Sequence, residues 1–139
     1  MSDSMIVFVK KSKLPNVNKL RDEVKSMGLE LEEWGESLEE IEGFWPGKVD
    51  GKEAGFEFFI GEVIDEDLED WGVDKEELKE RDFFIELAFY EELDIKACVI
   101  FVVALCKLAD AIALDDEGEL SIDAKSCLKW AKEEMGYSL

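Results

Sequence analysis

Residues 43–60 read GFWPGKVDGKEAGFEFFI, and this stretch decides the fold. Its centre, Asp50-Gly51, is the strongest short hairpin signal in the chain, because a two-residue turn needs positive φ at both positions, which Asp and Gly tolerate. We therefore predict two antiparallel strands, Phe44–Val49 and Glu53–Ile60.

Side chains in the second arm of this hairpin alternate between two faces. Phe56, Phe58 and Ile60 point one way, whereas Glu57 and Phe59 point the other. One face of the predicted sheet is therefore strongly apolar.

The flanking sequence predicts the remaining elements. We expect a strand Met5–Val9, a helix Val17–Met27 ended by Gly28, a strand from Leu29, a short helix capped by Asp74, a strand Phe83–Tyr90, a helix 94–114 and a last helix capped by Ser121 or Asp123. The order β-α-β-β-β-(α)-β-α-α predicts an α+β fold, with a largely antiparallel sheet of about four to five strands and helices packed on one face. The length of 139 residues fits a single domain over 1–139.

Charge restricts the partners of this protein. Asp and Glu number 36 against 16 Lys and Arg, giving a net charge of −20, while 47% of the residues are hydrophobic, enough for a sizeable core. Such a surface repels phosphate, so we expect no nucleic-acid and no membrane partner. A basic protein partner, or a need for solubility, explains the charge.

The negative charge is concentrated in the middle of the chain. Leu29–Trp45 holds seven Glu and no base, and Glu57–Glu92 holds fifteen acids against three bases. The first 28 residues are basic, and Lys10, Lys11 and Lys13 form a small turn that is either solvated or paired with the acidic surface of the same molecule.

The composition argues against catalysis. Without histidine, no Ser-His-Asp or Cys-His nucleophile and no His-ligated metal site can form. The three cysteines, Cys98, Cys106 and Cys127, lie in apolar helical patterns and form no CxxC, which fits buried thiols in a reducing compartment. We expect no enzymatic activity, no cofactor and no metal.

Two motif resemblances are weak. Asp65-x-Asp67-x-Glu69 resembles the start of a calcium loop, but the sixth position, which must be Gly, is Asp70. The glycines around Lys48 and Lys52 resemble phosphate loops, but each spacing is one residue short and no Ser or Thr follows. We interpret the first as a solvated acidic face and the second as hairpin turns.

The segment Ile95–Leu114 is apolar enough to raise the question of a membrane span. Lys96, Lys107 and Asp110 interrupt it, and helical geometry places them in one narrow stripe. We therefore expect a buried helix with one wet edge. No export signal is recognisable, so we expect a cytoplasmic protein.

Tryptophans beside acidic residues are the candidate binding residues. Trp34, Trp45 and Trp71 lie outside periodic apolar runs. They either cover the edge of the core or form a binding face of aromatic anchors with a carboxylate rim. On the second interpretation, the partner-binding residues are Glu33, Trp34, Glu36, Glu39, Glu40, Glu42, Asp65, Asp67, Asp70 and Trp71.

One stretch carries a family resemblance. The pattern Gly43-Phe44-x-Pro46, a spacer, and Gly55-Phe56-Glu57 followed by two aromatics resembles a small bacterial family, as does the Leu-Pro before the first helix. Such small acidic proteins are similar to immunity proteins encoded beside antibacterial toxins, including effectors of type VI secretion and Rhs-type toxins. The chain departs from the family pattern at Glu91–Asp94, where an aromatic and glycines are expected.

The resemblance implies a non-catalytic inhibitor of one cognate toxin. It would bind stoichiometrically and block the active site or substrate path of a toxin with a basic surface. A second hypothesis is a secretion or assembly adaptor that binds a cargo helix in an apolar groove. An acidic surface that serves solubility alone is the third.

Overall fold

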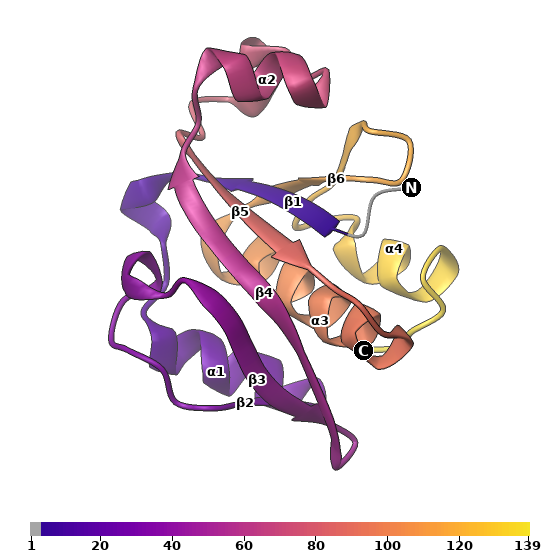
Figure 1. Cartoon of the computed structure of the whole chain (residues 1–139). Coiled ribbons are helices and arrows are strands. Elements are labelled where there is room, and N and C mark those ends of the chain that lie inside the picture. The colour runs from indigo at the N-terminus through magenta and orange to yellow at the C-terminus, as the bar shows by residue number, and fades with distance from the viewer. Residues whose placement is uncertain (1–3) are drawn as a thin grey trace.

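The Asp50-Gly51 turn joins the two longest strands of the sheet, β3 (Gly43–Val49) and β4 (Lys52–Glu62) (Figure 1). Both turn residues have positive φ, 52° and 81°, as the hairpin prediction requires. The structure is a computed structural model that describes residues 4–139, so the first three residues of the predicted domain lie outside the described residues.

The described residues form an α+β fold with a seven-stranded antiparallel sheet, in the order β2-β3-β4-β5-β1-β6-β7. The other strands are β1 (Ser4–Val9), β2 (Leu29–Leu31), β5 (Phe83–Ala88), β6 (Ile112–Leu114) and β7 (Leu120–Ile122). The helices are α1 (Val17–Ser26), α2 (Asp65–Trp71), α3 (Glu92–Ala109) and α4 (Cys127–Glu133), with short 3-10 turns at Lys11–Lys13, Leu38–Glu40 and Lys75–Leu78.

The prediction of four to five strands is wrong, because β6 and β7 have three residues each and are too short for alternation to reveal them. The predicted helix 94–114 includes β6, but α3 ends at Ala109. Asp110 adopts a left-handed conformation (φ 52°), and its carbonyl accepts hydrogen bonds from Nε and Nη2 of the buried Arg81. The predicted element order therefore lacks two strands between the last two helices.

Helices lie on both faces of the sheet, which corrects the prediction that one face carries them all. The main core lies between the sheet and the helices α1, α3 and α4. A smaller core on the other face is formed by Phe8, Leu68 and Leu78, and it places α2 beyond the end of β4 (Figure 1). Among the described residues, 4–139, no helix covers the rest of that second face, over β3 and β4.

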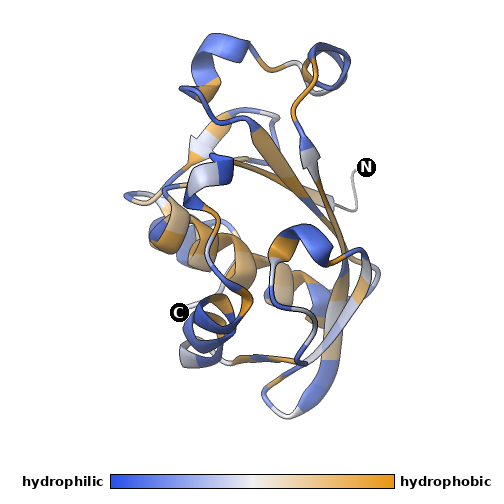
Figure 2. Ribbon diagram, turned by 90° about the vertical axis from the view of Figure 1, so that its left-hand side faces the viewer, coloured by the Kyte–Doolittle hydropathy of each residue, from blue (hydrophilic) through white to orange (hydrophobic). Residues whose placement is uncertain are grey.

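The long helix α3 is the centre of the main core. Its residues from Ala97 to Cys106 are all buried, and Phe101 packs edge-to-face against Trp45, Phe56 and Phe58 from the hairpin. Figure 2 shows apolar colouring along the strands of the sheet and along the helix that lies beside them. Among residues 4–139, none of the helices combines the length and apolar character needed to cross a bilayer.

The start of α3 carries a capping box that the sequence did not lead us to expect. The side chains of Glu91 and Asp94 each accept a hydrogen bond from the other's backbone N–H. Asp74 lies at the N-cap position of the 3-10 turn Lys75–Leu78, as predicted, but its side chain makes no capping hydrogen bond there.

Side chains protect both edges of the sheet. On β2, Arg21 donates from Nε to the Leu31 carbonyl over 3.1 Å. On β7, the Ser126 hydroxyl donates to the Ser121 carbonyl over 2.8 Å.

Gly55 on β4 lies close to the backbone of β3. This close approach predicts that an added methyl group costs more stability at Gly55 than at Gly61. A Cβ at Gly55 would lie 2.5 Å from the Trp45 carbonyl oxygen, whereas a Cβ at Gly61 meets only the Phe84 ring, at 3.2 Å. We expect Gly55→Ala to lower the free energy of unfolding by about 1–3 kcal/mol, because backbone cannot yield as a side chain does. Urea unfolding measures this, with Gly61→Ala in the same strand as the matched control. Equal losses in the two variants would contradict the prediction.

Candidate functional site

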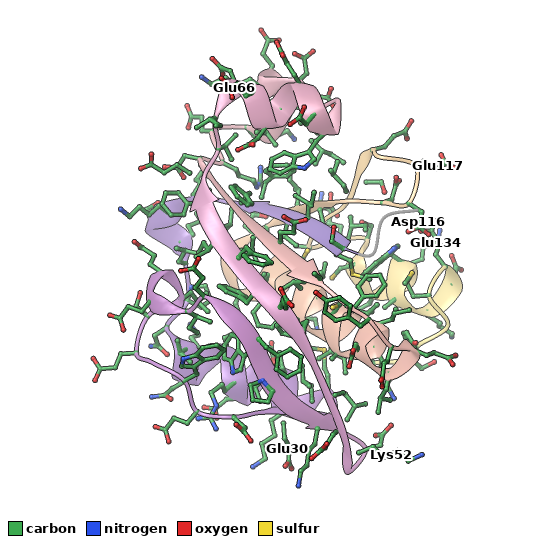
Figure 3. The ribbon with its side chains drawn as sticks, viewed as in Figure 1. Glu30, Lys52, Glu66, Asp116, Glu117 and Glu134 are labelled. Atoms are coloured by element: carbon green, nitrogen blue, oxygen red, sulfur yellow. The ribbon has the colours of Figure 1, made fainter. Side chains whose placement is uncertain are left out.

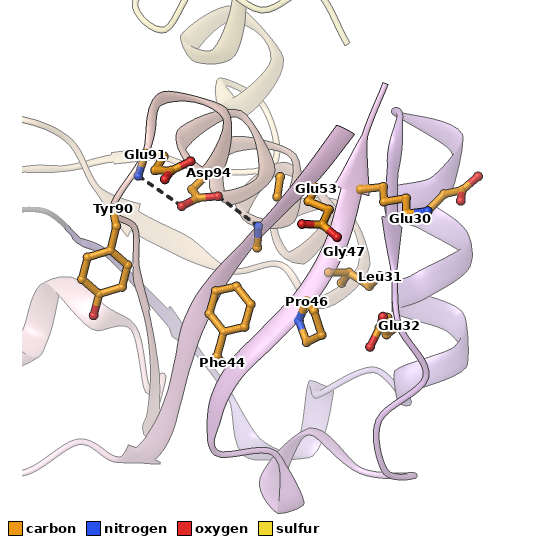
Figure 4. Close-up of a pocket in the computed structure, with 13 residues that line it drawn as sticks. Glu30, Leu31, Glu32, Phe44, Pro46, Gly47, Glu53, Tyr90, Glu91 and Asp94 are labelled. Atoms are coloured by element: carbon orange, nitrogen blue, oxygen red, sulfur yellow. Dashed lines mark hydrogen bonds between the residues drawn. The ribbon is translucent and has the colours of Figure 1, made fainter. Parts of the chain in front are cut away.

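A groove of about 650 Å³ crosses the uncovered face of the sheet from β2 over β3 to β4 and the start of α3 (Figure 4). Phe44 and Pro46 on β3, Gly55 on β4 and Tyr90 before α3 form its apolar part. This is the face opposite the main core, because the neighbouring residues Trp45 and Phe56 are fully buried on the helix side.

Gly55 forms the floor of the groove. A Cβ at this position would lie 2.8 Å from Cζ of Phe44, so the Phe44 ring lies directly over the glycine backbone. The ring nevertheless remains 50% exposed, and Tyr90 nearby is 69% exposed. Two exposed aromatic side chains that line one groove form apolar surface of the kind found at interaction sites, which makes the groove the candidate site.

A buried carboxylate fixes the wall of the groove. Asp94 is 9% exposed, and its Oδ1 accepts from the Gly55 N–H over 3.1 Å while Oδ2 accepts from the Glu91 N–H over 3.1 Å (Figure 4). Strand β5 pairs with β4 only from Glu57 onward. Asp94 therefore satisfies a β4 donor that has no strand beside it, and joins the hairpin to α3.

Tyr90 is oriented by a carboxylate on β4. Its hydroxyl donates to Glu57 Oε1 over 2.7 Å. This hydrogen bond, with the negative charge of Glu57, raises the pKa of the Tyr90 phenol above its usual value of 10.0. Phe44 lies opposite Glu57 in the strand register, so the aromatic rings and this carboxylate belong to one surface.

The groove is strongly acidic. Five acids line it, Glu30, Glu32, Glu53, Glu91 and Asp94, together with one base, Lys48. Lys48 lies between Glu30 and Glu53 in the register of β2, β3 and β4. Figure 3 shows Glu30 at the hairpin end of the sheet and Glu66 far from it on α2 (Figure 3). The combination of exposed rings and carboxylates suits binding of a cationic group.

The first group of predicted partner-binding residues lies in the connection between β2 and β3. Its five glutamates, Glu33, Glu36, Glu39, Glu40 and Glu42, are exposed. Trp34 is half-buried and packs edge-to-face on Trp45, with ring centroids 6.4 Å apart. Trp45 itself is fully buried and donates from Nε1 to the Glu32 carbonyl.

The second predicted group lies on α2. Asp65 and Asp70 are exposed and Asp67 is partly buried. Trp71 packs on Phe8 and Phe84, with ring centroids 5.4 and 5.2 Å away. The tryptophans of both groups thus contribute to the core edge, as one of the two interpretations expects. The stretch resembling a calcium loop is helical here.

The basic turn separates the two predicted groups. Lys11 Nζ lies 3.8 Å from Glu39, and Lys10 Nζ lies 3.9 Å from Glu80, so this turn is paired with the acidic surface of its own molecule. Figure 1 likewise shows α2 at the far end of β4, away from the β2–β3 connection (Figure 1). The two groups do not form one continuous acidic face.

Sequence reasoning missed the groove residues. The sequence predicts that Phe44 and Tyr90 lie in strands, but it predicts no binding role for them. It likewise predicts no role for Glu91–Asp94. The available signal was the alternation in β4, where Glu57 and the 36% exposed Phe59 face away from the core. An aromatic on the outer face of a strand adds to the apolar surface of that face and directs attention to it.

Comparisons with protein-family models, with curated proteins and with solved structures gave no match to this chain.

The Tyr90–Glu57 hydrogen bond predicts a titration difference. In Glu57→Gln the charge is lost and the phenolate is no longer repelled, so the pKa of Tyr90 should fall back toward 10. NMR of tyrosine labelled at Cζ, recorded from pH 8 to 12, measures this shift. Glu86→Gln, a charge change one strand away on the same face, should leave Tyr90 almost unchanged. A Tyr90 titration that is the same in wild type and Glu57→Gln would contradict the assignment.

Proposed function

We propose that this chain is a cytoplasmic immunity protein that binds and neutralises a cognate antibacterial toxin, of the kind delivered by type VI secretion or carried by Rhs proteins. It would act by stoichiometric occlusion of the toxin's active site or substrate path. The observation that carries the proposal is the acidic groove with exposed Phe44 and Tyr90, on a protein of net charge −20. Its partner is then a protein with a basic surface.

Long-range charge supports rapid recognition of such a partner. Toxins that act on nucleic acids or nucleotides present basic clefts, and an acidic inhibitor is steered toward them by its field. The exposed glutamates of the β2–β3 connection and the acids of α2 contribute most to this field, because they lie in the two most acidic segments of the chain. In this proposal they speed association, while the groove supplies the anchoring contacts.

The groove suits binding better than catalysis. The carboxylates of Asp94 and Glu91 are engaged with backbone N–H groups, and Glu57 accepts the Tyr90 hydroxyl. Their engagement within the protein supports a role for these carboxylates in shaping the groove.

The cysteines support the proposed compartment. Cys98, Cys106 and Cys127 are free and fully buried, and burial raises the pKa of the Cys98 thiol. Buried reduced thiols are typical of proteins that fold in a reducing environment.

A second candidate function is a secretion or assembly adaptor that binds a cargo helix. The half-exposed Phe44 and the exposed Phe59 favour it, because an amphipathic helix docks on apolar surface. The adaptor would differ from the immunity protein in the interaction that holds its partner, which is apolar contact instead of charge attraction. A cargo helix held by apolar contacts should bind almost independently of salt, whereas a basic toxin should not.

The decisive experiment is co-expression with the product of the adjacent gene. We expect a one-to-one complex on gel filtration and rescue of growth from that product, with the complex weakened between 50 and 500 mM salt. A cargo that is not toxic and binds equally well at both salt concentrations would favour the adaptor. No complex and no rescue would refute both functions.

Charge reversal tests the steering role of the two acidic groups. The variant carrying Glu39→Lys, Glu40→Lys, Asp67→Lys and Asp70→Lys should fold, because three of these side chains are exposed and Asp67 is only partly buried. We expect its association rate with the toxin to fall about tenfold or more at low salt, with a much smaller change in dissociation. Stopped-flow measurements at two salt concentrations check this. The control reverses Asp116, Glu117, Glu133 and Glu134 near the C-terminus, and equal slowing there would show that net charge alone acts.

A further inference from the structure

The groove holds more carboxylates than cations, with Lys48 the one lysine that lines it, opposite Glu30 and Glu53 in the strand register. Six ion pairs occur among residues 4–139, and none of them involves Glu30, Glu32 or Glu53. In the predicted acidic groups, too, only Glu39 takes part in one of these ion pairs, with Lys11. What distinguishes the groove is that its carboxylates lie beside the exposed rings of Phe44 and Tyr90.

We propose that this groove receives an arginine-bearing segment of the partner protein, with a guanidinium lying against Phe44 and Tyr90 and facing Glu53 and Glu57. This inference rests on the proposed function, because it takes the partner to be a basic protein. It adds the position of the anchor and its chemistry.

Guanidinium chemistry matches the groove better than an ammonium does. The group is planar, stacks on aromatic faces and is weakly hydrated, so it can lie against half-exposed rings such as Phe44. Its five donors can reach carboxylates on both sides of the rings. Glu57 and Glu53 are on the same strand as Gly55, one to each side of it, and Glu57 is held in place by the Tyr90 hydroxyl.

The negative charge of the groove argues against a second copy of this chain or a nucleic acid as its occupant. A second copy of this chain would bring another acidic face against five lining acids, which is repulsive. A nucleic acid would be repelled for the same reason. Among residues 4–139, no three Cys, Asp or Glu side chains are grouped so as to hold a metal ion, and both oxygens of Asp94 already accept backbone N–H bonds.

The test uses a defined probe, the capped peptide acetyl-Gly-Arg-Gly-Arg-Gly-amide, titrated into the isotopically labelled protein at low salt. We expect amide shift changes to concentrate at residues 44–48, 53–57 and 90–94. The same peptide with lysine in place of arginine should bind about fivefold more weakly, because an ammonium stacks less well on these rings.

Variants identify the anchoring rings. Phe44→Leu keeps an apolar side chain over Gly55 but removes the aromatic face. We expect it to lower the affinity for the arginine peptide about threefold to fivefold. Phe59→Leu is the matched control, an exposed phenylalanine on the same face that does not line the groove. Glu53→Gln should weaken binding more than Glu66→Gln on α2, although both remove one charge.

The outcomes separate this inference from the proposed function. Shift changes spread over α2 and the β2–β3 connection, equal binding of arginine and lysine peptides, or equal effects of Phe44→Leu and Phe59→Leu would overturn the groove assignment. A toxin complex that forms while the peptide avoids the groove would refute this inference alone. A peptide held in the groove, with no complex and no rescue by the adjacent gene product, would refute the immunity function instead.

Discussion

Edge-to-face packing of Trp45 with Phe56, Phe58 and Phe101 holds the hairpin on the long helix, and the rest of the structure depends on it. The ring centroids lie 5.7–6.2 Å from that of Trp45. These contacts fix which face of β3 and β4 is buried, because side chains along a strand alternate. Phe44 and Glu57 are consequently directed outward. The exposed aromatic surface is therefore the opposite side of the same hairpin that builds the core.

Asp94 fixes one wall of the groove on this outer side of the hairpin. A buried carboxylate is costly unless its oxygens accept hydrogen bonds, and here both do. It occupies the position beside Gly55 that a neighbouring strand would otherwise fill. The N-terminus of α3 thus lies beside β4 at the point where β5 no longer pairs with it. This junction forms one wall of the groove. The segment Glu91–Asp94 thereby shapes the groove.

Local signals predicted the hairpin, the helices α1 and α3 and the antiparallel character of the sheet, because each depends on neighbouring residues. The end of α3 could not be predicted in this way, since Asp110 is held by Arg81, which is 29 positions away. The groove was missed for a similar reason. Tryptophan and charge density drew attention to Trp34 and Trp71, yet both rings pack on core residues. Whether an aromatic is exposed is decided by tertiary packing, and Phe44 and Tyr90 carry no local mark of it.

The protected edges of the sheet limit how any partner can approach. The terminal strands β2 and β7 have three residues each, and the Leu31 and Ser121 carbonyls are already occupied by Arg21 and Ser126. A visiting strand would have to displace these donors and would gain few backbone hydrogen bonds in return. Extension of the sheet, whether by a ligand peptide or by self-assembly into fibres, is thereby disfavoured. Recognition is left to side chains on the open face, so specificity can change by single substitutions there while the backbone scaffold stays the same.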